Sequence, residues 1–153
     1  MNKSIETVKK LRSTLIRFTG ELNNEQLNKV PANFNNNIIW NMAHIISAQQ
    51  GLCYVRCGLK TVVDEPFFLA YRPGTKPEGI VDNKEVELIK TLLLSTIDKL
   101  ETDYDENIFT NYPTFTTHYG VELTSIEDAI NFLSFHDGFH MGYILALKRA
   151  VLQ

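Results

Sequence analysis

The sequence predicts an all-α protein, a four-helix bundle with a long crossover connection. Four long segments repeat their apolar residues with the 3.6-residue period of a helix. Glycine, proline and asparagine separate these segments, as is usual at helix ends. Segments that alternate polar and apolar residues are too few to build a sheet. A chain of 153 residues suits a single domain, 1–153, with one buried core.

The first two helices are predicted at residues 4–19 and 37–58. The first carries an apolar stripe and ends at Gly20; the stripe is Ile5, Val8, Leu11, Leu15 and Phe18. Asparagines lead into the second helix, and several of them are suited to cap its first turn; they are Asn33, Asn35, Asn36 and Asn37. Gly58 ends the second helix.

Residues 61–81 are predicted to form an ordered crossover. Prolines and glycines there prevent a long helix; they are Pro66, Pro73, Gly74, Pro77 and Gly79. An apolar run in the same region is too hydrophobic for a free linker and is expected to pack against the bundle; it contains Phe67, Phe68, Leu69 and Tyr71.

The last two helices are predicted at 82–101 and 124–150, with a loop over 102–123. Asp82 or Asn83 begins the third helix. Thr124 and Glu127 have the spacing of a capping box, which predicts the start of the fourth helix.

Composition excludes several classes of partner. The net charge of -3 gives no general attraction for nucleic acid, and the densest basic group, Lys9, Lys10 and Arg12, is interpreted as a solvated helix face. No run approaches the ~18 apolar residues of a membrane span. The N-terminus lacks the apolar block of a signal peptide, so a cytoplasmic location is expected. Cys53 and Cys57 are interpreted as small buried apolar residues rather than a redox pair.

Three histidines have the context of a metal site. His136 and His140 are four residues apart, so they project from one face of the last helix within an apolar stretch. Each of two adjacent buried imidazoles needs a partner for its ring nitrogens, and neither is easily protonated there. A shared divalent ion would bind the unprotonated nitrogens of both. His44 lies in a second apolar helix and supplies a third nitrogen, which leaves coordination positions open for water or substrate.

The surroundings of His44 suggest further expectations. Trp40, one turn earlier on the same face, is expected to be buried near the metal and to line the cavity. Ser47, Ala48 and Gly51 are small, which would either leave room for a ligand or let two helices approach closely.

Other candidate ligands are less suitable. His118 lies in a loop without an apolar context and is expected to be exposed or packed in that loop. Cys53 is nine residues beyond His44, roughly 13 Å along a helix, which excludes the cysteines from the site. The spacing from His136 to His140 also resembles the zinc protease motif, but the thirteen residues that follow contain no third ligand.

The chain resembles the DinB/YfiT-like superfamily of metal-dependent enzymes. The resemblance rests on Trp40 four residues before His44, on the Gly74-Thr75-Lys76-Pro77 crossover and on the segment from His136 to Gly142. It implies a four-helix bundle that holds nickel or zinc, with manganese and iron as alternatives, through His44, His136 and His140. Many members have glutamate where this chain has Asp137, so the role of that carboxylate, orienting group or proton acceptor, stays open.

The resemblance also implies an activity and an assembly. The family contains thiol transferases that join a low-molecular-weight thiol to an electrophile, along with a maleylpyruvate isomerase-like branch. We therefore expect a transferase or hydrolase that activates a small thiol or water; the alternative is a metal- or ligand-binding stress-response protein without turnover. Family resemblance favours a homodimer, and Gly138 and Gly142 would form a flat strip where another helix, of this bundle or of a partner, approaches.

Overall fold

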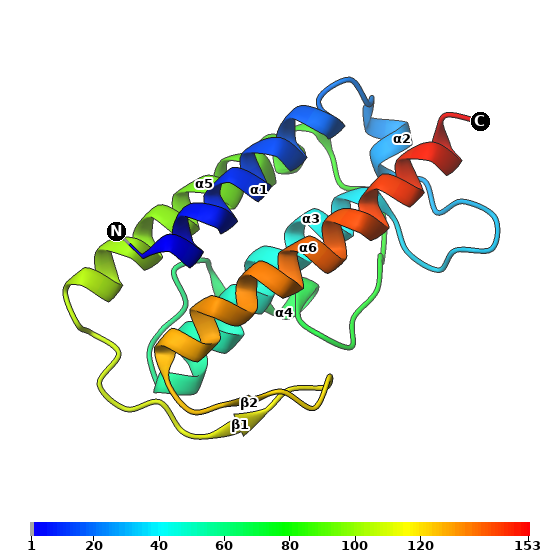
Figure 1. Cartoon of the computed structure of the whole chain (residues 1–153). Coiled ribbons are helices and arrows are strands. Elements are labelled where there is room, and N and C mark those ends of the chain that lie inside the picture. The colour runs from blue at the N-terminus through cyan, green and yellow to red at the C-terminus, as the bar shows by residue number, and fades with distance from the viewer. Residues whose placement is uncertain (1) are drawn as a thin grey trace.

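The computed structural model describes residues 2–153 and confirms the all-α bundle. Its four long helices are α1 (Lys3–Thr19), α3 (Ile38–Gln49), α5 (Asn83–Asp105) and α6 (Ile126–Val151) (Figure 1). Helix α1 contacts α5 and α6, and α3 contacts the same two helices. The four helices therefore surround the core in the order α1, α5, α3, α6.

The direction of the helices explains the long crossover. In Figure 1, α1 and α6 run one way along the bundle, while α3 and α5 run the other way. Because α3 and α5 are parallel, the chain between them must return along the bundle. This return contains the short helix α4 (Glu65–Tyr71), which packs on α3. Phe67 and Tyr71 are buried as predicted, whereas Leu69 is exposed.

Two of the predicted helix caps are confirmed and one is wrong. The side chains of Asn37 and Asp82 accept backbone N–H groups at the starts of α3 and α5. At the start of α6 the cap is Ser125, not Thr124, and its hydroxyl accepts the N–H of Asp128 at 3.1 Å. The carboxylate of Asp128 in turn accepts the Thr124 N–H at 2.8 Å. The cap therefore lies one residue later than predicted.

The second predicted helix changes form along its length. It is α-helical only to Gln49, continues as a π-helical turn (η1, Gln50–Tyr54) and then as a 3₁₀ turn (η2, Val55–Cys57). Gly58 ends it with φ 72°, a left-handed conformation that favours glycine.

Periodicity did not reveal the short elements. Helix α2 (Asn24–Asn28) precedes α3, and α5 extends four residues beyond its predicted end at 101. The predicted loop 102–123 contains a small antiparallel hairpin, β1 (Phe115–Thr116) and β2 (Glu122–Leu123). None of the helices within residues 2–153 is both long and apolar enough to cross a membrane.

A polar layer divides the core into two apolar clusters. The layer takes one fully or almost fully buried residue from each long helix; these are Arg12, Gln49, Thr96 and Asp137. The interpretation of Arg12 as part of a solvated face is therefore wrong. The buried stripe of α1 is Ile5, Val8, Arg12, Leu15 and Thr19, so Leu11 and Phe18 lie at its edges.

Candidate metal centre

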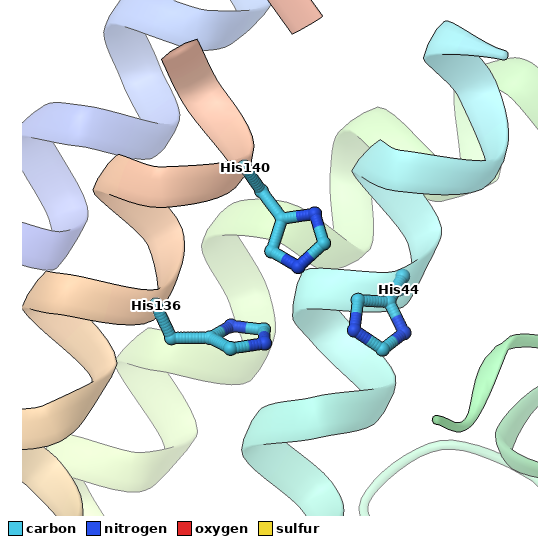
Figure 2. Close-up of side chains that lie close together, drawn as sticks. All are labelled: His44, His136 and His140. Carbon is cyan, nitrogen blue, oxygen red and sulfur yellow. The ribbon is translucent and has the colours of Figure 1, made fainter. Parts of the chain in front are cut away.

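Helices α3 and α6 bring the three predicted histidines together. His44 projects from α3, and His136 and His140 project from successive turns of α6 (Figure 2). Candidate ligand nitrogens, one from each ring, all lie within 4.8 Å of one another. Figure 2 shows each ring turning one nitrogen toward the space between the three. This arrangement could hold a divalent metal ion.

The crossover sets the tautomer of His44. Its Nδ1 lies 2.8 Å from the backbone carbonyl of Tyr71, the last residue of α4. A carbonyl only accepts hydrogen bonds, so Nδ1 carries the proton. The lone pair is then on Nε2, which points toward the other two rings.

An asparagine on α3 does the same for His140. The Nδ2 of Asn41 donates to the carbonyl of Asn37 at 2.7 Å, which fixes the orientation of the amide. The Oδ1 of Asn41 therefore faces the Nδ1 of His140, at 2.9 Å, and must accept its proton. The Nε2 of His140 is left as the ligand nitrogen. Asn41 is almost fully buried, so the pair is shielded from water.

His136 lacks a partner of this kind. Its Nδ1 lies 3.7 Å from the Oδ1 of Asp137, which is beyond hydrogen-bond distance. Both atoms are buried, and neither has a hydrogen-bond partner within residues 2–153. The other carboxylate oxygen, Oδ2, accepts from the Nε of Arg12 at 2.7 Å. A small movement of the His136 ring would let its Nδ1 donate to Asp137, as metal-binding histidines commonly do.

A cavity of about 750 Å³ opens beside the three histidines. Ala48 of α3 and Gly51 of η1 line it, so these small residues leave room for a ligand. Trp40 is buried next to His44, as predicted, and its ring stacks on the His44 ring with centroids 4.6 Å apart. The prediction that Trp40 lines this cavity is wrong, because it faces a separate, smaller pocket with Tyr71. A shared helix face does not specify on which side of His44 the cavity opens.

Electrostatics keep the cluster ready to bind a cation. Burial lowers the pKa of His44 to about 4 and the pKa of His140 to about 3, so both are neutral at pH 7. Burial by itself would raise the pKa of Asp137, but the Arg12 guanidinium and the neighbouring His136 together outweigh it, so that pKa is lowered overall. A carboxylate next to the cluster is therefore ionised.

Comparison with known proteins identifies the family. The family model of the DinB superfamily matches residues 7–144, a segment that includes all three histidines. The chain belongs to the DinB superfamily. No curated protein matches the chain significantly. The resemblance inferred from the motifs is thus confirmed at the level of the superfamily.

The other candidate ligands of this DinB chain lie outside the cluster. His118 is exposed, as predicted, and it lines the cavity without joining the three histidines. Cys53 and Cys57 are free thiols, and burial raises the pKa of both. The cluster thus offers three nitrogens and no thiolate, a donor set that several divalent transition metals accept.

Sequence reasoning missed the residues that support the cluster. The Tyr71 partner is a backbone carbonyl and has no sequence signature. Asn41 had a signal, since a polar residue within an apolar helix must find a buried partner. The sequence signal for Arg12 was weaker: it lies between Val8 and Leu15 on the helix face that the apolar residues form.

Proposed function

We propose that this DinB protein is a metal-dependent enzyme that activates a small thiol, or water, against a small electrophilic substrate. The observation that carries the proposal is the convergence of three histidine nitrogens beside an open cavity. Enzymes keep coordination positions free for a reactant, whereas structural sites are closed by a fourth protein ligand.

His44, His136 and His140 would hold a divalent ion as neutral imidazoles, and the ion would then supply positive charge that lowers the pKa of a bound thiol or water. The residues of the chain position this chemistry. Tyr71 and Asn41 orient two of the rings through their Nδ1 atoms, and Asp137 is placed to orient the third.

The rival proposal is a protein that holds a metal or a small ligand without turnover, as a stress-response module. The cavity favours the enzyme over a metal store, which gains nothing from an adjoining space large enough for a small organic molecule. A protein that binds a small ligand would use the same cavity, so turnover separates it from the enzyme. We propose zinc or nickel as the ion, and manganese and iron are the alternatives to test beside them.

We further propose a homodimer formed across the exposed face of α6. Phe135 and Phe139 are about half exposed there, which favours burial against a second copy. Added Cβ atoms at Gly138 and Gly142 would meet nothing within 4 Å, so no helix within residues 2–153 packs on the strip. A cytoplasmic location stays a prediction.

A conjugation assay tests the proposed activity. Zinc-loaded protein without an affinity tag is mixed with glutathione, cysteine or 2-mercaptoethanol and with 1-chloro-2,4-dinitrobenzene. In this reaction the thiolate sulfur bonds to the ring carbon, chloride leaves with the C–Cl electron pair, and the thiol proton goes to solvent.

We expect turnover that disappears in metal-free protein and in His44→Ala, while Lys10→Ala, an exposed change on α1, keeps it. A panel of thiols and electrophiles without metal-dependent turnover in a protein that binds zinc tightly would support the rival proposal instead.

A further inference from the structure

The cavity beside the histidines has an apolar wall and a cationic part. Its wall consists of aliphatic and aromatic side chains; these are Leu52, Val55, Phe68, Phe115 and Phe132. Arg56, which is half-buried, and Arg72, which is exposed, line the same cavity. The cavity thus combines surface for an apolar body with groups for an anion.

The charge of the cavity differs from that of the whole chain. The chain has 18 acidic against 15 basic residues, a net charge of -3. Yet among the lining residues, all of which fall in the described range 2–153, none is aspartate or glutamate. A cavity with cations alone and low-dielectric walls concentrates positive potential and attracts anions. A divalent ion at the histidines would increase this potential.

Arg56 is held in place by an aromatic ring rather than by an ion pair with a described residue. Its guanidinium carbon lies 3.2 Å from the centroid of the Phe115 ring, in hairpin strand β1. Stacking on a ring occupies the face of the guanidinium and leaves its N–H edges free to bind a carboxylate. The side chain is half-buried, so an anion bound there would be partly shielded from water.

Arg72 is tied to the metal centre through the backbone. It directly follows Tyr71, whose carbonyl holds the His44 ring. Five lysines form ion pairs with acidic side chains elsewhere on the protein. Within residues 2–153 neither Arg56 nor Arg72 does so, although both face one cavity. Their charges are therefore available to a ligand.

We propose that the cavity binds a small organic anion with an apolar or aromatic body. Arg56 binds its carboxylate, Arg72 adds positive potential to the same cavity, the wall covers its body, and its reactive end faces the three histidines. The inference rests on the proposed function, because it takes the cavity as the substrate site of the metal centre. It deepens that function by naming the chemical class of the substrate.

Two probes that differ by one charge test the proposal. The anionic probe is 1-anilinonaphthalene-8-sulfonate, and N-phenyl-1-naphthylamine is the same aromatic body without the sulfonate. Binding of each is followed by fluorescence to the full-length protein, with zinc and without it, in the parent, in Arg56→Gln/Arg72→Gln and in Arg149→Gln. Arg149 is an exposed arginine near the end of α6 that does not line the cavity.

We expect the double variant to raise the dissociation constant of the anionic probe about tenfold or more, since hydrogen bonds to charged groups contribute more than neutral ones. The neutral probe should bind the parent and the double variant equally, and Arg149→Gln should bind both as the parent does. Equal weakening of both probes, or unchanged binding of the anion, overturns the proposal. Binding does not require turnover, so a protein that fails the conjugation assay can still pass this test.

Discussion

Two buried polar clusters lie next to each other in the bundle, and they differ in how their polar atoms are used. The polar layer, Arg12, Gln49, Thr96 and Asp137, directs its groups mainly at one another. Arg12 donates to Gln49 and Asp137 at 2.7 Å and also reaches the Leu93 carbonyl. The histidine cluster instead turns three nitrogens toward a shared space beside a cavity.

The difference separates a structural cluster from a binding one. A buried charge is tolerated when its hydrogen bonds are made, and Arg12 is bonded to residues of α3, α5 and α6. Buried nitrogen lone pairs that accept no hydrogen bond are tolerated when a bound ligand, such as a metal ion, interacts with them. The clusters adjoin at His136 and Asp137, where one carboxylate oxygen belongs to the layer and the other faces the His136 ring.

Breaking the polar layer should have the largest effect on stability. Arg12→Met leaves the Asp137 carboxylate buried without its partner, so we expect a loss of about 3–5 kcal/mol in the free energy of unfolding. Urea unfolding followed by circular dichroism measures the loss. Lys10→Met, an exposed change on the same helix, should cost little. A variant as stable as the parent would show that the layer does not carry the structural role assigned to it.

The second-largest effect is expected at Asp137, whose carboxylate the two clusters share, and it concerns metal affinity. Asp137→Asn weakens the acceptor that faces His136, so we expect zinc to bind about 10–100-fold more weakly. Competition with a chromophoric chelator gives the dissociation constant of the folded variant. Thr96→Val alters the polar layer without touching a histidine, so it should lower stability yet keep zinc affinity. If both variants bind zinc as the parent does, the two clusters are independent.

The free energy of unfolding of the metal-free protein should depend on pH through the histidine cluster. His44 and His140 have folded pKa values of about 4 and 3, below the ordinary 6.5. As pH falls below 6.5 the unfolded chain takes up protons that the folded histidines refuse, so the free energy of unfolding falls. Urea titrations between pH 7 and 5 should show this loss, and His140→Gln should reduce it. A stability that stays flat over this window contradicts the burial assigned to these rings.

The smallest effect is expected on the outer face of α6. A Cβ added at Gly142 meets no atom of the described residues within 4 Å, so Gly142→Leu should fold with parental stability and zinc content. In the proposed homodimer it should reduce the mass measured by light scattering toward that of one chain. Ser13→Leu, on an exposed position of α1, is the matched control. A parent that is monomeric at micromolar concentration ends the dimer proposal.

The sequence predicts the bundle and the three histidines because both rest on helical periodicity. His44, His136 and His140 stand out as polar residues in apolar helices, and the structure brings them together. The prediction that Arg12 is solvated is wrong because it equates charge with exposure, although Arg12 lies on the buried face of α1. The Tyr71 carbonyl depends on how the crossover returns over α3, which local sequence does not encode. Trp40 shows the same limit, since helix spacing does not tell on which side of His44 the cavity opens.

The metal content of protein purified without an affinity tag tests the central claim most directly. Elemental analysis should find one divalent ion per chain in the parent and in His118→Ala, whose side chain lies outside the cluster. His44→Ala, His136→Ala and His140→Ala should each lose most of that ion, because each removes one of three ligands. A parent that takes up no ion, or a His44→Ala variant that retains the parental content, would contradict the claim that these three histidines form a metal site.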